Sequence, residues 1–340
     1  MLQKTIIQGR IEYGTEKAFN MARKMYVQRA ENYYKNDVLF DIDEIFFEDG
    51  YFLNVPRFVK QVYAKTLKNT STLFEYVTQF GVAGEMNIWA LEEGKILMYK
   101  HLEPDSDKVA VQQYIKGKSL INEKGKEKEA IKALDKAIEK YNRHAQAYER
   151  RAKVNFILKK DHDAIRDYNK SIGLDPNNPY AHFGKAEVYI RKNELEEAIE
   201  CLDLAIKKSV ALQAIHWISR RLKGKLHLRL EQYEKAEFEL KLFTKRKFGP
   251  DNPNLMWRRD AFFDYGLTLL GLEDYAGAVA AFESSLDLEK GNDKIPDAEK
   301  LRYRGIAKQK AGQNGFKKDI KEAASLGDKE AVRLLKKIAS

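Results

Sequence analysis

Hydrophobic and small residues in the middle of the chain recur with a period of 34 residues. Within each period the apolar positions lie three or four residues apart, which is the spacing of one helix face. Two antiparallel helices need small side chains where their axes cross and large ones beside the crossing. Six positions repeat in this way, and the pairs are Tyr148 and His182, Ala152 and Ala186, Asn155 and Tyr189, Ala164 and Ala198, Tyr168 and Leu202, and Ser171 and Ala205. The pattern predicts one helical hairpin per period, with Pro176 ending the second helix.

The unit at 145–178 has a small residue at its eighth position, alanine at its twentieth, a large apolar residue at its twenty-fourth and Asp175-Pro176 at its end. This pattern resembles the tetratricopeptide repeat (TPR). The resemblance implies a right-handed superhelix of stacked hairpins whose concave side is a long binding surface, because a single hairpin cannot bury its second face.

The same positions predict a repeat region at 109–290 with five units, at about 111–144, 145–178, 179–212, 214–250 and 256–290. Residues 295–340 are predicted to form a degenerate repeat and a C-terminal capping helix. The segment KRKFGPDNPN is the longest irregular insertion in the array. Loops of this kind on a rigid scaffold often carry function, and a plain spacer is the alternative.

Residues 1–108 lack the repeat and are predicted to form a small N-terminal cap domain. Helices are expected from Thr15 to Asn36 and from Pro56 to Leu67. A further short helix is expected after them, capped by Thr70 or Ser71.

The clearest strand pattern in the chain follows these predicted helices. Two apolar runs, at 86–91 and 96–101, flank the turn EEGK and predict a β-hairpin, and a short strand or irregular edge is expected within residues 38–52. The EEGKI turn resembles the last hairpin of the nuclear transport factor 2-like domains, some of which hold a ligand pocket. The expected fold is mainly α: a TPR-like α-α superhelix of about five to six hairpins, preceded by a small α+β N-terminal domain.

The composition limits which cellular compartment and which class of partner are expected. The single cysteine, Cys201, allows no internal disulfide and favours a reducing compartment. No segment reads as a signal peptide or as about 18 consecutive apolar residues, so a cytoplasmic protein is expected. Residues 1–110 carry 14 Lys and Arg against 16 Asp and Glu, and residues 111–340 carry 47 against 35. The excess of positive charge in the repeats can attract acidic proteins or nucleic acid.

Catalytic and metal-binding motifs are missing from the sequence. It has no glycine-rich phosphate loop, HExxH pair, nucleophile elbow or paired-cysteine metal site. The six histidines have no ligand spacing on one helix face, and Cys201 lies beside core positions, where a packed hydrophobe is a simpler interpretation than a reactive thiol. We therefore expect no cofactor, no metal site and no enzyme.

The resemblance to TPR proteins implies candidate partner-binding residues on the first helix of each hairpin. In such arrays the second, fifth, ninth, twelfth and thirteenth positions line the concave groove. The candidates selected from these positions are Gln146, Glu149, Lys153, Tyr180, Phe183, Glu187, Arg191, Arg221, Lys225 and Arg229. Phe156, Ile157 and Ile190 hold further groove positions, and for them packing against the next hairpin is an equal alternative.

A groove that mixes aromatic residues with Arg and Lys suits a peptide or protein segment bearing acidic groups. Some TPR co-chaperones hold a carboxylate of a chaperone's C-terminus in a clamp of Lys, Asn and Arg on three successive units. The matching positions here do not reproduce that clamp, whether the series starts at the first unit (Ile115, Ser119, Arg150, Tyr180, Gly184) or at the second (Glu149, Lys153, Gly184, Ile218, Leu222). The predicted function is a non-catalytic protein-interaction scaffold.

Two alternatives to the groove remain open. Basic residues gather at 220–230, at 245–247 and from Lys300 onward, with Trp217, Trp257 and Tyr303 among them, and could bind nucleic acid or a ribosome if they share one face. Solvated helix faces are the commoner explanation of such stretches. The N-terminal domain could instead bind a small ligand, or be the functional part that the repeats present.

Overall fold

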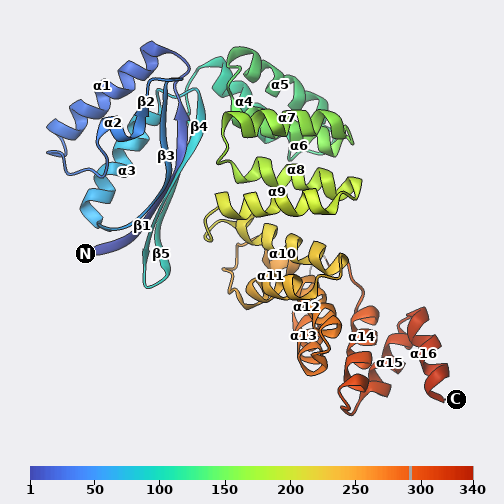
Figure 1. Cartoon of the computed structure of the whole chain (residues 1–340). Coiled ribbons are helices and arrows are strands. Elements are labelled where there is room, and N and C mark those ends of the chain that lie inside the picture. The colour runs from blue at the N-terminus through green and yellow to red at the C-terminus, as the bar shows by residue number, and fades with distance from the viewer. Residues whose placement is uncertain (291–292, 340) are drawn as a thin grey trace. The chain divides into compact units, whose positions relative to one another are not determined.

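The computed structural model describes residues 1–290 and 293–339. These residues form two compact units, Met1–Gly184 and Lys185–Ser340, which divide inside helix α8 (Pro179–Lys192). The first unit contains a sheet and the first helical hairpins, and the second contains helices (Figure 1). Each unit has its own hydrophobic clusters.

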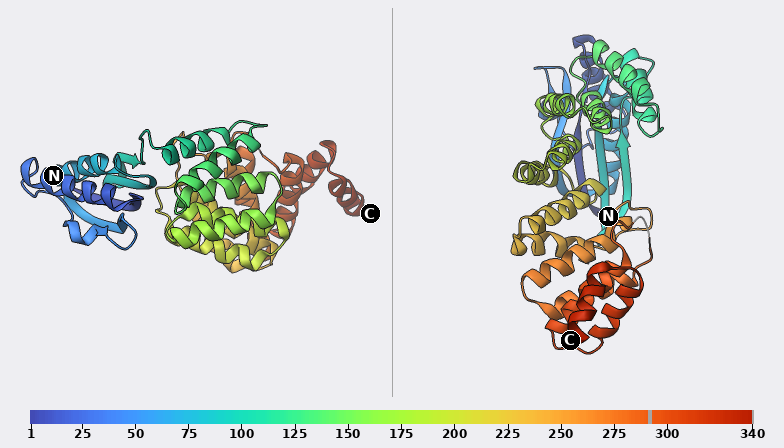
Figure 2. Two further views of the ribbon diagram at one scale, coloured as in Figure 1. Left: turned by 90° about the horizontal axis from the view of Figure 1, so that it is seen from above. Right: turned by 90° about the vertical axis from the view of Figure 1, so that its right-hand side faces the viewer.

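An antiparallel sheet forms the N-terminal part of the first unit. Its strands are β1 (Leu2–Glu12), β2 (Phe46–Phe47), β3 (Phe52–Tyr63), β4 (Ala83–Glu92) and β5 (Lys95–Leu102), in the order β2-β3-β1-β4-β5. Helices α1 (Glu16–Asn32) and α3 (Ala64–Thr78) cover one face of the sheet, and α2 (Ile42–Ile45) leads into β2 (Figures 1 and 2). Ile7, Phe19, Phe74 and Met86, each at most 1% exposed, lie in the core of this domain.

The structure corrects the prediction for residues 52–67. The expected helix from Pro56 to Leu67 is wrong, because residues 52–63 form β3 and pair with β1. Pro56 is tolerated because the register of the two strands shifts between Ile7 and Gly9, which places the proline at an irregularity rather than in a regular ladder. A proline that suggested a helix start is here a residue of a β-bulge.

The other N-terminal predictions have mixed outcomes. Residues 2–12 form the central strand β1, which the sequence pattern had not indicated. Helix α3 begins at Ala64, so Thr70 and Ser71 are buried inside it rather than capping its start. The helix capped by Thr15 is confirmed, as is the hairpin of β4 and β5.

Helical hairpins follow the sheet in the first unit. They consist of α4 (Val109–Leu120) with α5 (Glu127–Lys140), and α6 (Ala145–Ile157) with α7 (Asp161–Leu174). Small residues lie where the helices cross. A Cβ atom on Gly117 would be 2.6 Å from Leu134 Cγ, so the glycine is what lets α4 approach α5 this closely.

The second unit continues the array. Its helices are α9 (Leu195–Lys208), α10 (Ala214–Arg229), α11 (Tyr233–Lys245), the 3-10 turn η1 (Leu255–Trp257), α12 (Arg258–Gly271), α13 (Tyr275–Asp287), α14 (Asp297–Lys310), α15 (Phe316–Ser325) and α16 (Lys329–Ala339). Gly224 faces Leu240 and Gly266 faces Phe282 at the helix crossings. The predicted fold class, a TPR-like helical array preceded by a small α+β domain, is confirmed.

The sheet and the first hairpins of unit 1 share a buried contact. The hydroxyl of Tyr141, at the end of α5, donates to Glu12 Oε2 at 2.9 Å. Val82, Ala83 and Ala110 pack around the same tyrosine. Further along, Lys118 of α4 pairs with Glu103 at 2.8 Å, and α6 contacts β4. The N-terminal domain therefore packs against the first helical hairpins of the array.

Candidate functional site

The candidate residues of the second repeat lie against the sheet of unit 1. Gln146 is 7% exposed and Glu149 is 4% exposed, on the helix that contacts β4. Burial raises the pKa of the Glu149 carboxyl, and Arg150 and Lys153 oppose that rise. Both side chains are covered where α6 contacts β4, so of the three candidates on this helix only Lys153 is exposed.

Tyr180 and Phe183, from the start of α8, are half-buried in the same unit. The Arg150 guanidinium lies 5.9 Å from the Tyr180 ring centroid, and Glu85 of β4 and Tyr99 of β5 both act electrostatically on Tyr180. Burial is the main reason that the pKa of the Tyr180 hydroxyl rises to about 12. The sheet thus covers much of the helix face on which the first repeats were expected to bind a partner.

The candidates of α10 form a basic row in unit 2. Arg221, Lys225 and Arg229 follow one another at intervals of four residues, which places them on one face of the helix. Arg229 Nη2 donates to Asn193 Oδ1 at 2.9 Å. Arg191 of α8 is exposed and Glu187 is half-buried.

Arg221 has an unusual environment for a candidate partner-binding residue. It is only 7% exposed, and its guanidinium carbon lies 4.5 Å from the Trp257 ring centroid. Burial lowers its pKa, while Asp264 and Asp260 oppose that effect. Its Nε atom has no hydrogen-bond partner among the residues that the structure describes.

Two carboxylates of α12 face this row, and sequence reasoning missed both. Asp260 and Asp264 are each 3% exposed and lie one helical turn apart. Lys225 Nζ is 3.8 Å from Asp264 Oδ2, which is an ion pair but not a hydrogen bond. Extending the groove positions to the fifth unit would have found Asp260, because it holds the second position there when Gly266 is aligned at the eighth. The basic row of α10, together with Trp257, Asp260 and Asp264, is called the α10–α12 face below.

The side chains at the three apolar groove positions differ in their exposure to solvent. Ile157 is 46% exposed, so its side chain keeps a large part of its surface in solvent. Phe156 and Ile190 are half-buried. None of the three is a fully buried core residue.

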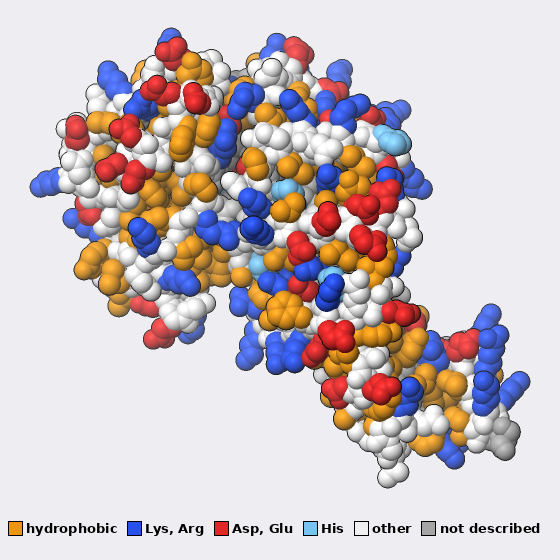
Figure 3. Space-filling model, viewed as in Figure 1, with side chains coloured by type: hydrophobic (Ala, Val, Ile, Leu, Met, Phe, Trp, Pro, Cys, Tyr) orange, Lys and Arg blue, Asp and Glu red, His pale blue; other side chains and the backbone are white. Residues whose placement is uncertain are grey.

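The basic stretches of the sequence are largely engaged within the protein. Arg220 and Lys223 both pair with Glu239, at 2.6 and 2.9 Å. In the C-terminal stretch Arg302 pairs with Asp328 at 3.0 Å and Arg304 with Asp319 at 2.6 Å. Figure 3 shows Lys and Arg interspersed with Asp and Glu over the face in view. Ion pairing therefore weakens the electrostatic case for nucleic acid, although Lys245, Arg246 and Lys247 are exposed.

Other kinds of site receive little support from the described residues. Within them no group of three or more His, Cys, Asp or Glu side chains is arranged to hold a metal ion. The Cys201 thiol is buried, which raises its pKa.

A pocket of about 770 Å³ at the sheet edge is lined by Glu75, Thr78, Gln79, His101, Leu102, Glu103, Pro104, Asp105 and Ile115. None of the helices in the described part of the chain combines the length and the apolar character that crossing a membrane requires.

Sequence comparison agrees with this architecture. Two tetratricopeptide repeat family models match, one at residues 123–179 and one at 162–214. The TPR repeat-containing protein MJ1428 of Methanocaldococcus jannaschii is 38% identical over 91 residues, which is 26% of this chain and 16% of that protein. The chain thus matches only a small part of the length of this relative.

Solved structures show the same fold at low identity. The structure of YrrB, described as a TPR protein with an unusual peptide-binding site, aligns with a TM-score of 0.51 at 19% identity, over 60% of this chain and 98% of that chain. The Pseudomonas aeruginosa pilF structure aligns with a TM-score of 0.54 at 15% identity, over 68% of this chain and 98% of that chain. The fold defines the class of helical-repeat proteins. Within that class, residues 123–214 match tetratricopeptide repeat models, and proteins with such repeats are generally protein-interaction scaffolds.

Proposed function

We propose that this protein is a non-catalytic scaffold that binds an acidic segment of a protein partner on the α10–α12 face. The single observation that carries the proposal is the basic row of Arg221, Lys225 and Arg229, of which Arg221 lies against the Trp257 ring. Aromatic and arginine side chains are the residues that most often dominate protein interfaces. A rigid helical array also loses little conformational freedom on binding.

The candidate residues of unit 1 contribute less to this proposal. Gln146 and Glu149 are buried where α6 contacts β4, so the proposed surface excludes them. In unit 2, Arg191 is exposed and Glu187 is half-buried, and both stay candidates. In unit 1, the exposed Lys153 and the half-buried Tyr180 and Phe183 stay candidates of that unit by itself.

The test compares partner capture by two double variants with equal charge change. Lys225→Glu with Arg229→Glu reverses the exposed end of the basic row and leaves buried Arg221 in place. Lys235→Glu with Lys241→Glu makes the same change on α11, where both lysines are exposed. Tagged wild-type and variant proteins are used to capture partners from a native lysate at low and high salt, and protein and RNA in the eluates are quantified.

We expect the α10 double variant to lose a discrete protein that the wild type and the α11 control both retain, with unchanged circular dichroism. Equal retention by all three proteins would contradict the proposal. RNA that is captured at low salt and lost steeply at high salt would instead favour binding through the exposed residues 245–247.

A further inference from the structure

Two cationic side chains lie over the ring of Trp257. Arg221 comes from α10, at 4.5 Å from the ring centroid, and the Lys294 ammonium comes from the segment before α14, at 5.5 Å. Contacts of this length between a cation and an indole ring are attractive, and more so where water is excluded. Two separate parts of unit 2 therefore place positive charge at the indole ring.

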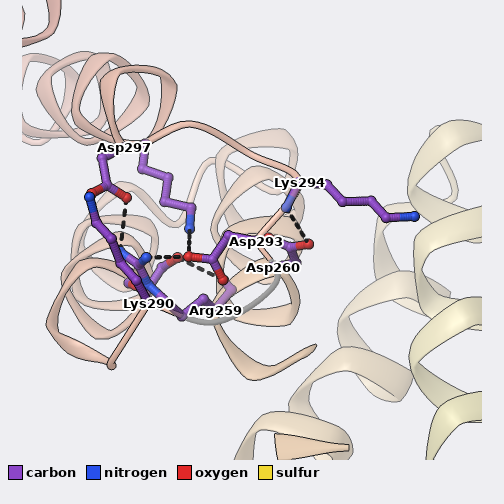
Figure 4. Close-up of polar contacts among 8 residues, drawn as sticks. Arg259, Asp260, Lys290, Asp293, Lys294 and Asp297 are labelled. Atoms are coloured by element: carbon purple, nitrogen blue, oxygen red, sulfur yellow. Dashed lines mark hydrogen bonds and ion pairs between the residues drawn. The ribbon is translucent and has the colours of Figure 1, made fainter. Parts of the chain in front are cut away.

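The position of Lys294 is fixed by its neighbours. Asp293 pairs with Arg259, which is 3% exposed, and the backbone N–H of Lys294 donates to Asp260 Oδ2 at 3.4 Å. Figure 4 shows the Lys294 side chain pointing away from the cluster around Arg259. The segment is thus anchored to α12 while its lysine remains exposed.

Several buried polar atoms around these cations lack hydrogen-bond partners. Asp264 Oδ2, Asp260 Oδ1 and Arg221 Nε make no hydrogen bond to any residue that the structure describes. Buried polar groups without a hydrogen bond are costly, so such atoms normally mark a place for water or for a ligand. Arg221 and Lys225 both act electrostatically on Asp264, and the Lys294 ammonium lies at Trp257. These three cations and the carboxylates of Asp260 and Asp264 together carry one net positive charge, which favours an anion.

We propose that Arg221, Lys225 and Lys294 form a subsite around Trp257 that binds a carboxylate side chain of the partner, and that Asp264 competes with this carboxylate for the same cations. The inference rests on the proposed function and adds the chemical group that the partner must present. It also gives the face a built-in dependence on pH.

The competition depends on the protonation of Asp264. Burial raises the pKa of its carboxyl to about 6, although Lys225 and Arg221 of α10 oppose the rise, and Asp260 on its own helix adds to it. Lys300 of α14 faces Asp260, and among the described residues the charged groups that act on Asp264 are Lys225, Arg221 and Asp260. A glutamate in a flexible peptide has a pKa of about 4.3 and stays ionised at pH 6. Acidification from pH 7.5 to pH 6 therefore protonates about half of the Asp264 carboxylates, while the ligand glutamates stay ionised.

The experiment titrates the full chain with a hexaglutamate peptide at low salt and measures heat of binding. Hexaglutamine of the same length is the uncharged control. We expect hexaglutamate alone to bind, with an affinity that rises about threefold to tenfold between pH 7.5 and pH 6, because one like charge is lost from the site. Asp264→Asn should bind at pH 7.5 at least as tightly as the wild type does at pH 6, and should lose the pH dependence.

Two variants on the cation side complete the test. Arg221→Gln should weaken binding by about tenfold or more, the usual effect of losing a hydrogen bond to a charged group. Lys225→Gln, at a side chain that is 40% exposed, tests the same subsite with little risk to folding. The α11 double variant should leave binding unchanged.

The outcomes separate this inference from the proposed function. Identical affinity and pH profile in wild type and Asp264→Asn, or unchanged binding by both cation variants, would overturn the subsite. If partner capture still depends on Lys225 and Arg229 in that case, the scaffold function stands and only the carboxylate subsite is lost. If the subsite binds hexaglutamate as expected but capture is insensitive to Lys225 and Arg229, the proposed function fails instead.

Discussion

His144 precedes α6 and caps it with its ring. Its Nδ1 accepts the backbone N–H of Ala147 at 3.3 Å, and its ring centroid lies 4.6 Å from that of Tyr114. The residue is 1% exposed, and burial lowers the pKa of its imidazole to about 3. The neutral ring is therefore the form that the fold accommodates.

This burial predicts a loss of stability in acid. An unfolded histidine has a pKa of about 6.5, so between pH 6.5 and pH 3 the unfolded state binds the extra proton. The stabilisation is complete above pH 6.5 and is lost as the pH falls through that window, by about 2 kcal/mol at pH 5. His144→Asn keeps a capping side chain and should remove this part of the pH dependence. Urea denaturation of both proteins at pH 7.5 and pH 5 measures it, and parallel pH dependences would refute the assignment.

The candidate residues show what sequence can tell about a site at this scale. The helix period placed Arg221, Lys225 and Arg229 on one face of α10, because that spacing depends only on local geometry. It could not show that Glu149 is buried, since α6 contacts β4 through a long-range contact that no local pattern encodes. The sequence also could not show that Arg220 pairs with Glu239, because this contact joins two different helices.

At the scale of the element, glycines decide how closely paired helices approach. A Cβ atom on Gly266 of α12 would be 2.5 Å from Phe282 Cε1, and Phe282 is fully buried. Gly173, near the end of α7, has nothing within 4 Å of the same position. The two glycines provide a matched pair of alanine substitutions.

Gly266→Ala should destabilise unit 2 by about 1–3 kcal/mol, because the phenyl ring has no space to move. Gly173→Ala should instead stabilise its helix by about 0.5–1 kcal/mol, since alanine loses less backbone entropy and nothing obstructs it. Calorimetric unfolding of the two variants and the wild type would test the opposite signs. A loss of stability in both would show that space at the crossing is not the deciding factor.

Elements were predictable where one local rule dominated. The 34-residue period with small residues at fixed positions predicted the hairpins, since each hairpin packs by the same rule as its neighbour. Residues 52–63 were mistaken for the start of a helix because Pro56 is also compatible with a bulged strand. Strand β1 escaped notice because its pairing partners lie about 50 and 80 residues further along the chain.

At the scale of the whole molecule, an ionic network joins the last hairpins of unit 2. Arg259 of α12 donates through Nε to the Ser285 carbonyl at 2.8 Å and through Nη2 to Asp297 at 2.9 Å, and it also pairs with Asp293 (Figure 4). The Lys300 ammonium is fully buried, 3.7 Å from Asp293. One arginine thus connects α12, α13 and the start of α14.

Arg259→Met should loosen the C-terminal helices. Breaking a buried ion pair from one side typically costs about 3–5 kcal/mol, because the remaining charges lose their partner. Hydrogen exchange should therefore accelerate across residues 297–339 and stay unchanged in α9. Arg333→Met, which removes an exposed pair with Glu330, should have almost no effect. Equal exchange in the two variants would mean that apolar packing alone holds these helices.

The contact between Glu12 and Tyr141 has a consequence for the order of events during synthesis. Its two residues are 129 positions apart, and Glu12 is 6% exposed in the finished protein. At a translation rate of about 5–20 residues per second, roughly ten seconds pass between the emergence of the carboxylate and that of its hydroxyl partner. During this interval the end of β1 at Glu12 lacks the hydroxyl that Tyr141 later supplies. A pause in translation before residue 141 would lengthen the time for which a chaperone can bind this part of the nascent chain.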